Sequence, residues 1–195
     1  MRFHFDPVPE SPDFKPDSSW QLLREPPTWI WQLMALPIGI VNALLVAFLW
    51  FKVTPLVFAM ETFAFLKSIT GRIVCVVGVL VAHELLHFAI HPMGGCSRNS
   101  ILVFWPAKLL LFAAYTGEIT RTRVLVMLLM PFLVISILPL FTAAVAQVAL
   151  GWAAFASTFN ALMAGGDLLS AGITLFRIPA NAVMRGQGWK TYVRK

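Results

Sequence analysis

Charge is the scarcest feature of this chain. Only 12% of its 195 residues are charged, whereas 58% are hydrophobic. A soluble domain of this length needs more polar surface, so the composition indicates one integral membrane domain with polar ends. The formal net charge is +6, but Lys and Arg stand at the ends of apolar segments without forming a basic patch. We therefore expect a lipid bilayer, and not a nucleic acid, as a partner.

Cysteine is also scarce, and the N-terminus lacks an apolar run. Cys75 lies within an apolar segment and Cys96 lies beyond its end, so a helix would separate them too far for a disulfide bond. We expect two free thiols. Residues 1–27 contain no hydrophobic region of the kind found in a cleavable signal peptide. The first hydrophobic segment is thus expected both to target the chain and to anchor it.

The composition divides the chain into three parts. Residues 1–27 hold six prolines and most of the acidic residues, which predicts an extended, solvated tail. Residues 28–178 are predicted to form the membrane domain. Residues 179–195 are predicted to form a basic C-terminal tail.

Four apolar segments are long enough to cross a bilayer as helices. The first lies between Glu25 and Lys52, and the second runs from about residue 73 to 91, where Pro92 and the glycines after it stop the helix. Thr120 is expected to cap a third helix, near 122–149, which Pro131 and Pro139 should kink. A fourth is expected near 153–176. The sequence thus predicts an all-α polytopic membrane protein.

Two shorter apolar stretches do not fit a spanning helix. Residues 53–67 are interrupted by a proline and a glutamate, which favours an interfacial or partly buried connector. Residues 100–116 consist of two apolar runs around Pro106-Ala107-Lys108, a sequence with turn chemistry. They are compatible with a small membrane-dipping β-hairpin or with a short interfacial helix.

The distribution of basic residues predicts the orientation in the membrane. With four spans, the N-terminal tail, the loop 92–123 and the C-terminal tail share one side. That side holds all 15 Lys and Arg except Lys52, Lys67 and Arg72. The positive-inside rule then places both termini in the cytoplasm.

The second apolar segment carries the motif His83-Glu84-Leu85-Leu86-His87. Residues four apart share one face of a helix, so both imidazoles can face one metal ion, with Glu84 beside them to hold a water molecule. Zinc favours neutral imidazole ligands with a carboxylate close by. Ionisable clusters are costly inside a membrane segment, so a metal site is favoured over a structural pair of histidines.

A zinc site needs a third protein ligand, and Asp167 is the favoured candidate. It lies inside the fourth apolar segment, where a metal ion would neutralise its charge. Counted along the helices, Asp167 and the two histidines lie at similar depths, about 15 Å and about 8–14 Å from the cytoplasmic face. Gly165 and Gly166 are expected to let this backbone approach the second span closely. The alternative is a structural carboxylate paired with arginine.

Two other residues compete for the third position. His91 continues the histidine stripe, but it is two turns from His83, which favours an interfacial residue at the helix end. Glu118 lies in a polar loop beside Arg121, where a solvated or capping role is expected.

Together these features resemble the site-2 protease class of intramembrane zinc metalloproteases. The shared features are HELLH in a membrane helix, a hairpin-like stretch after it, and Asn160 before a later membrane aspartate. A closer resemblance, from about Gly71 to the C-terminus, is to a bacterial family of small membrane proteins described as putative zincin peptidases. It includes the sequences Met130-Pro131-Phe132 and Arg177-Ile178-Pro179.

The resemblance implies zinc held by His83, His87 and Asp167, with Glu84 as general base, at a site facing the cytoplasm of a bacterium. Asn160 becomes a candidate contact to the substrate or the oxyanion. The expected function is hydrolysis of peptide bonds in a membrane protein or peptide near the cytoplasmic face. The edge of a hairpin at 100–116 could hold that substrate in extended form.

Two alternatives belong to other functional classes. Site-2 proteases usually have proline after this asparagine and glycine after the aspartate, whereas this chain has Ala161 and Leu168. A non-catalytic protein of the same fold that binds a partner or a regulatory metal is therefore the main alternative. A metal transporter is less favoured, because one three-ligand site provides no pathway.

Overall fold

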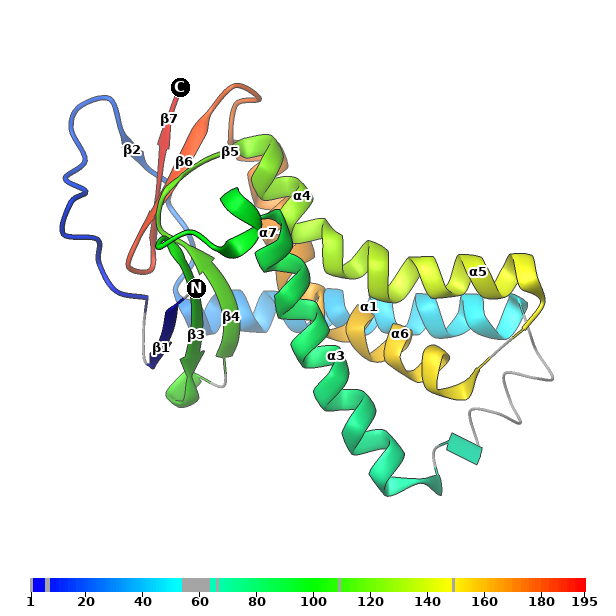
Figure 1. Ribbon diagram of the computed structural model, residues 1–195. Helices are drawn as coiled ribbons and strands as arrows, with labels where there is room; N and C mark the ends of the chain where they lie inside the picture. Colours follow the sequence, from blue (N-terminus) through cyan, green and yellow to red (C-terminus); the bar gives the residue numbers. More distant parts are fainter. Residues whose placement is uncertain (1, 6–7, 54–63, 66, 109, 149) are drawn as a thin grey trace. The chain divides into compact units, whose positions relative to one another are not determined.

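The computed structural model describes residues 2–5, 8–53, 64–65, 67–108, 110–148 and 150–195. The chain divides into two compact units (Figure 1). One unit comprises Met1–Pro27, Glu84–Leu128 and Ala171–Lys195, and the other comprises Thr28–His83 and Leu129–Ser170. The β-strands belong to the first of these, whereas the second is helical.

In the part of the chain that the structure describes, three helices are long and apolar enough to cross a membrane. They are α1 (Thr28–Val53), α3 (Ile69–Ile90) and the helix Arg121–Ala146. The third is assembled from α4 (Arg121–Pro131), a π-helical segment (Phe132–Ile137) and α5 (Leu138–Ala146). These helices match the first three predicted spans. The predicted connector at 53–67 falls largely outside the described residues.

The fourth predicted span is two helices and not one. Helix α6 (Gly151–Met163) and helix α7 (Gly165–Arg177) are bent by 48° relative to each other. The break falls at Ala164, directly before the consecutive glycines Gly165 and Gly166. Asp167 consequently lies in the first turn of α7 and not in the middle of a helix. A carboxylate is favourable there, because the amide dipoles give a helix N-terminus partial positive charge.

The predicted start of the third helix and the predicted end of the second are confirmed. Helix α4 begins at Arg121, and the Thr120 hydroxyl accepts a hydrogen bond from the Arg123 amide at 3.4 Å. Helix α3 ends at Ile90 and is followed by a 3₁₀ turn, Pro92–Gly95. Met93, Gly94 and Gly95 all have positive φ in this turn, which no helix can continue through.

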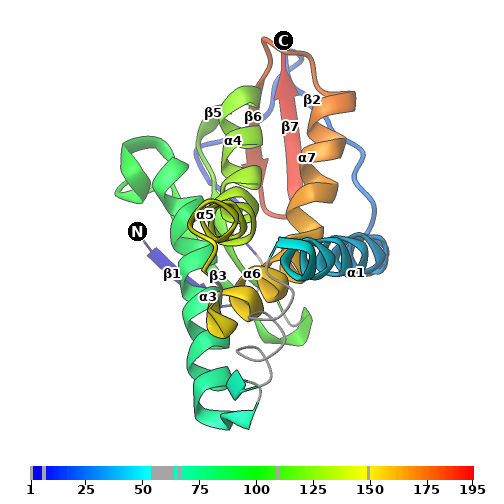
Figure 2. The same cartoon turned by 90° about the vertical axis from the view of Figure 1, so that its right-hand side faces the viewer.

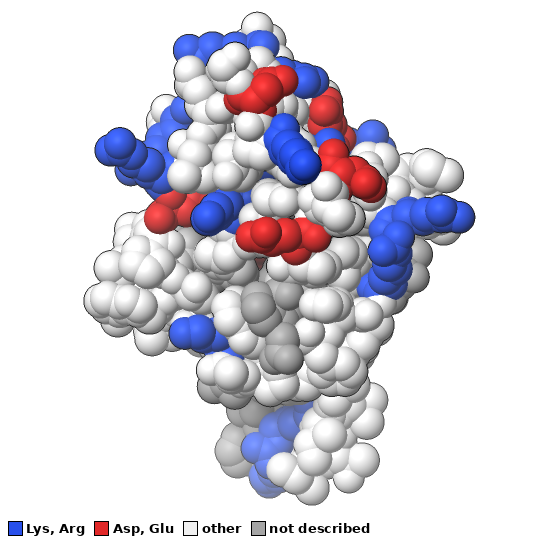
Figure 3. All heavy atoms as spheres, turned by 90° about the vertical axis from the view of Figure 1, so that its left-hand side faces the viewer, with Lys and Arg blue, Asp and Glu red and all other residues white. Residues whose placement is uncertain are grey.

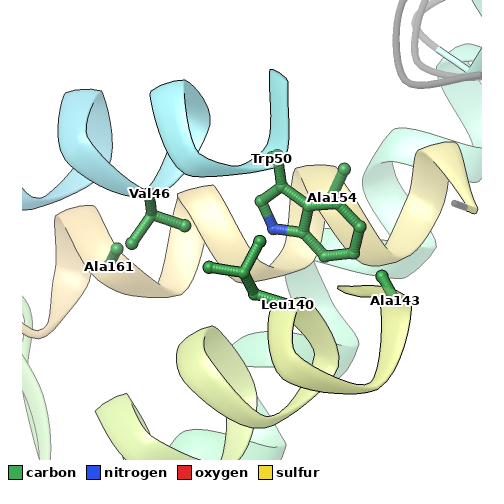
Figure 4. Packing of buried hydrophobic residues seen from close by; sticks show 6 residues of the cluster. All are labelled: Val46, Trp50, Leu140, Ala143, Ala154 and Ala161. Atoms are coloured by element: carbon green, nitrogen blue, oxygen red, sulfur yellow. The ribbon is translucent and has the colours of Figure 1, made fainter. Parts of the chain in front are cut away.

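The helical unit is held by the packing of α1 along α6, with α5 against both. Its core contains small and large side chains in contact: Val46, Trp50, Leu140, Ala143, Ala154 and Ala161 (Figure 4). The Trp50 indole is fully buried, and its Nε1–H donates to the Ser157 hydroxyl at 3.0 Å. Burying a tryptophan in this unit is favourable only because its polar N–H also finds an acceptor.

The glycines near Asp167 pack against the first helix and not against the second. A Cβ added at Gly165 would lie 2.5 Å from the Ala35 carbonyl oxygen, and one at Gly166 would clash with the Trp31 ring. Both Ala35 and Trp31 belong to α1. The expected close approach therefore exists, but its partner is α1 because the break at Ala164 redirects the chain.

Residues 100–116 form a β-hairpin, which decides between the two predicted alternatives. Strands β3 (Ser100–Trp105) and β4 (Leu110–Tyr115) are antiparallel and pair Leu102 with Ala113. The N-terminal strand β1 (Arg2–Phe5) adds parallel to β3, giving the order β1-β3-β4. The described residues thus form two sheets in a mostly helical protein, so the prediction of an all-α fold with a possible hairpin was imprecise.

The second sheet joins both ends of the chain (Figure 2). Its order is β2 (Gln21–Leu22), β7 (Lys190–Arg194), β6 (Val183–Gln187) and β5 (Glu118–Thr120). The N-terminal segment is extended, as predicted, but Val8 and Phe14 are buried and not solvated. The Phe14 ring contacts Trp20 and Tyr192 edge to face. The N-terminal segment is ordered because its strands pair with strands elsewhere in the chain, which its proline content did not suggest.

Charged side chains of both signs are interspersed on the face shown in Figure 3. Among the exposed pairs, Arg194 contacts Glu118 at 2.8 Å. On this face the basic side chains therefore form no continuous surface of one sign, in agreement with their scattered positions along the sequence.

Candidate metal centre

The HELLH motif lies in the second half of α3, which is continuous through it. His83 and His87 are one turn apart on this helix, and both are buried. His83 Nε2 lies 3.0 Å from Asp167 Oδ2. His83, His87 and Asp167 each offer one ligand atom, and these atoms lie within 4.8 Å of one another. The three residues favoured from the sequence thus form a possible metal-binding group.

The hydrogen bond to Asn160 determines which nitrogen of His83 faces this group. Asn160 Nδ2 donates to the Pro131 carbonyl at 3.0 Å, so its Oδ1 must be the acceptor toward His83 Nδ1, at 2.8 Å. Nδ1 of His83 therefore carries the hydrogen. Its Nε2, on the side of Asp167, is the nitrogen that can offer a lone pair to a metal.

A main-chain carbonyl plays the same part for His87. Its Nδ1 lies 2.9 Å from the carbonyl oxygen of Met127 in α4. A carbonyl can only accept, so Nδ1 is again the donor and Nε2 is left for a ligand bond. In an α-helix the Met127 carbonyl would bond to the amide four residues later, but that residue is Pro131, which has no N–H. The proline explains why this carbonyl can accept from His87.

The donor set fits a zinc ion. It consists of two imidazole nitrogens whose other nitrogens already donate hydrogen bonds, and one carboxylate. Two ligand atoms about 2.0–2.1 Å from a tetrahedral zinc ion lie about 3.3 Å apart, close to the observed 3.0 Å between His83 Nε2 and Asp167 Oδ2. Three protein ligands also match the open arrangement of catalytic zinc sites.

Glu84 is buried beside the histidines and is held by the hairpin. Its Oε2 accepts a hydrogen bond of 2.7 Å from the Ala113 amide of β4. Ala113 stands opposite Leu102 of β3, but its N–H points away from β3 to reach Glu84. In an antiparallel strand the direction of these groups alternates, so Leu111 and Tyr115 direct their amides toward the same edge.

The two competing ligands lie elsewhere. His91 is fully buried, with its Nδ1 3.2 Å from the Ser100 hydroxyl and its ring between Phe88 and Tyr115. Although His91 directly follows the last residue of α3, its side chain is not exposed there, because the hairpin covers it. Burial is the main cause that lowers the His91 pKa to about 4, assisted by the nearby His87 and Arg123. Glu118 is exposed, as expected, and pairs with Arg194 and not Arg121.

Asn160 is fully buried, and both hydrogens of its amide are engaged. One is donated to the Pro131 carbonyl and the other to the Ser136 hydroxyl, at 2.9 Å. An oxyanion contact by Asn160 would require one of these hydrogen bonds to break. From the sequence, Pro131 was expected to kink its helix and was part of the family resemblance, whereas Ser136, Met127 and Ala113 were not singled out. A buried serine in an apolar helix is a detectable signal, whereas the two main-chain groups leave none.

Comparisons with known proteins identify the family. Residues 76–183, more than half of the chain, match a family described as "Putative zincin peptidase". No curated protein and no solved structure matches the chain. The matched region contains HELLH, the hairpin, Pro131, Asn160 and Asp167. The chain therefore belongs to the family described as putative zincin peptidases, a membership that supports a zinc-dependent metallopeptidase.

Proposed function

We propose that this protein is a membrane-embedded zinc metallopeptidase of the site-2 protease-like type. Its substrate would be a membrane protein or peptide, cut near the cytoplasmic face. The observation that carries the proposal is the group of His83, His87 and Asp167 on apolar helices, with the buried carboxylate of Glu84 beside it. Membership of a zincin peptidase family supports the same chemistry.

The distribution of exposed apolar residues supports the membrane part of the proposal. Helix α1 exposes Leu33, Val41, Leu44 and Phe48, each more than half exposed, although a soluble protein would bury such residues. Helix α3 likewise exposes Ile73, Val74, Val77 and Val81 while it buries His83 and His87. Apolar residues outside and ionisable residues inside are typical of a helix surrounded by lipid.

The chemistry follows from the residues around the site. A bound zinc ion would lower the pKa of a water molecule there and polarise the scissile carbonyl group. Glu84 would accept the proton that the water loses during its attack, and would then pass this proton to the leaving amine nitrogen. The Ala113 amide holds the Glu84 carboxylate in place, and the side chains of His83, His87 and Asp167 would hold the ion.

The edge of β4 provides a place for an extended substrate. β4 pairs with β3, and among the described residues its other edge has no strand partner. A peptide added there would use the main-chain groups of Leu111 and Tyr115 and the carbonyl of Ala113 for strand pairing. Since the Ala113 amide already bonds to Glu84, such a peptide would lie directly beside the general base. A helical substrate segment would have to unwind first.

The test of this function is a Glu84→Gln variant of the full chain. Glutamine keeps the volume of the side chain but cannot accept a proton, so the rate should fall by about 10²–10⁴-fold while zinc remains bound. Proteomics of variant cells should then reveal an uncleaved membrane protein that co-purifies with the variant. Glu118→Gln, which changes an exposed glutamate, serves as the control and should behave as wild type.

A non-catalytic protein of the same fold predicts a different result. Its packing and its metal site would be intact in the Glu84→Gln variant, so this variant would fully restore the phenotype of a deletion strain. That outcome would replace the peptidase proposal with a protein that binds a partner or a regulatory metal.

We propose further that both termini lie in the cytoplasm of a bacterial membrane. The support is the distribution of Lys and Arg, of which only Lys52, Lys67 and Arg72 lie on the opposite side in a four-span arrangement. Reporter domains fused after residue 27 and after residue 195 should both report a cytoplasmic location. A periplasmic signal from either fusion would overturn this orientation.

A further inference from the structure

Pro131 and Asn160 are linked to the two histidines by hydrogen bonds, although neither offers a ligand to the metal. Pro131 leaves the Met127 carbonyl without its helical donor, and this carbonyl accepts from His87 Nδ1 at 2.9 Å. The carbonyl of Pro131 itself accepts from Asn160 Nδ2 at 3.0 Å. Asn160 in turn accepts from His83 Nδ1 at 2.8 Å. One proline is thus linked to both histidines.

The polar network around Asn160 fixes the orientation of its amide. Ser136 lies in the π-helical segment and accepts from Asn160 Nδ2 at 2.9 Å. Ser136 and Ser157 donate to each other's carbonyl oxygens, at 2.9 and 2.7 Å, which ties the π-helical segment to α6. Trp50 donates to the Ser157 hydroxyl. All of these side chains are fully buried, so water cannot replace their hydrogen bonds.

We infer that Asn160 and Pro131 are positioning residues, which hold the imidazoles of His83 and His87 with Nε2 facing the metal. This inference rests on the proposed zinc site. Its physical basis is that a histidine ligand is oriented by the hydrogen bond of its other nitrogen, and the loss of such a partner typically weakens metal binding by about 10–100-fold. Asn160 acts through its side chain, whereas Pro131 acts through a missing N–H and a carbonyl.

Replacing Asn160 has a defined consequence for His83. In an Asn160→Leu variant, Nδ1 loses its acceptor, while Nε2 still faces the Asp167 carboxylate at 3.0 Å. Nδ1 then has no acceptor to hold its hydrogen, whereas hydrogen on Nε2 still has the carboxylate as its acceptor. The variant would then present to the metal a nitrogen that already carries a hydrogen.

The decisive measurement is ¹⁵N NMR of the histidine rings in the full, metal-free chain in detergent. It reports which ring nitrogen carries hydrogen, and each signal is assigned from a variant that lacks that histidine. We expect hydrogen on Nδ1 of His83 in the wild type and its loss from Nδ1 in Asn160→Leu. Asn160→Asp, which keeps an acceptor at this position, should keep hydrogen on Nδ1.

The same chain provides matched controls. Asn42 lies in α1, and among the described residues its side chain bonds locally, to the Ile38 carbonyl at 2.8 Å, so Asn42→Ala should leave both rings unchanged. Pro131→Ala supplies a helical N–H to the Met127 carbonyl and should weaken the bond to His87, with a smaller effect than Asn160→Leu. Pro139→Ala, in the same long helix, is the control for the removal of a proline.

Zinc titration of the same proteins separates this inference from the proposed function. Asn160→Leu should bind zinc about 10–100-fold more weakly than wild type, and Asn42→Ala should bind it equally well. A wild-type chain that binds no zinc would contradict the proposed function, while the NMR result would still decide the positioning. Hydrogen on Nδ1 of His83 in both wild type and Asn160→Leu would overturn the inference. Absence of hydrogen from Nδ1 of His83 in the wild type would do the same.

Discussion

The two halves of the HELLH motif are held by different kinds of groups. His83 is oriented by a side chain, the Asn160 amide, within a network of buried serines and a tryptophan. Glu84 and His87 are oriented by the main chain, through the Ala113 amide of β4 and the Met127 carbonyl of α4. Each arrangement satisfies a buried polar group, which would otherwise be costly in an apolar environment.

This difference determines how His83, the first half of the motif, and Glu84 with His87, the second half, respond to mutation. A side-chain partner is removed by one substitution, so the His83 half can be altered at Asn160 or Ser136. A main-chain partner persists through almost every substitution, because every residue has a carbonyl and only proline lacks the N–H. We therefore expect the Glu84 half to tolerate changes of side chain in β4 while it remains sensitive to the backbone there.

Within this comparison, the largest effect is expected from Ala113→Pro, which removes a main-chain amide that bonds to the Glu84 carboxylate. Proline is tolerated in an edge strand where the N–H points away from the neighbouring strand, as it does here. The general base would lose its orientation, and displacement by about 1 Å can cost about 10²-fold in rate. We expect kcat to fall on the substrate captured with the Glu84→Gln variant, with zinc content unchanged.

Leu111→Pro is the matched control on the same edge. It also removes an outward amide, but this amide is not the one that bonds to Glu84. It should raise KM through a weaker strand pairing of the substrate and leave kcat nearly intact. An Ala113→Pro enzyme with the kcat of the wild type would show that the main chain does not orient Glu84.

A smaller effect is expected at His91, whose neutral ring is buried against the Ser100 hydroxyl. A proton added at Nε2 would find no acceptor among the described residues, and the pKa is lowered to about 4. The unfolded chain binds a proton near pH 6.5, so the folded state loses stability as pH falls from about 6.5 toward about 4. The loss should reach about 1.4 kcal/mol between about pH 7.5 and about pH 5.5.

Thermal unfolding in detergent across this pH range measures the loss. His91→Phe keeps a ring between Phe88 and Tyr115 but cannot titrate, so its stability should depend less on pH by about this amount. An equal pH dependence in the wild type and in His91→Phe would assign the effect to other groups.

Sequence reasoning located the parts of the protein that periodicity and residue chemistry determine. The apolar runs located α1, α3 and the helix Arg121–Ala146, and the motif spacing brought His83 and His87 to one face. The cost of a carboxylate in an apolar segment singled out Asp167. Turn chemistry at Pro106 left the hairpin as one of two alternatives, and the structure selected it.

The remaining features depend on contacts between distant segments. The Pro-rich N-terminus pairs with β3 and β7, which no local pattern within residues 1–27 indicates. Gly165 and Gly166 pack against α1 and not against the second span, because the chain bends at Ala164. The partners of Glu84 and His87 are main-chain groups, and a main-chain N–H or carbonyl is common to nearly every residue, so the sequence cannot mark them.

The zinc content of Asp167→Ala, measured by mass spectrometry of the metal in the purified full-length protein, tests the central claim most directly. His83, His87 and Asp167 together form the proposed site, so wild type should carry about one zinc ion per chain and Asp167→Ala should lose it. Glu118→Ala removes an exposed carboxylate that pairs with Arg194, and it should keep its zinc. An Asp167→Ala protein that retains a full complement of zinc would contradict the proposed metal centre.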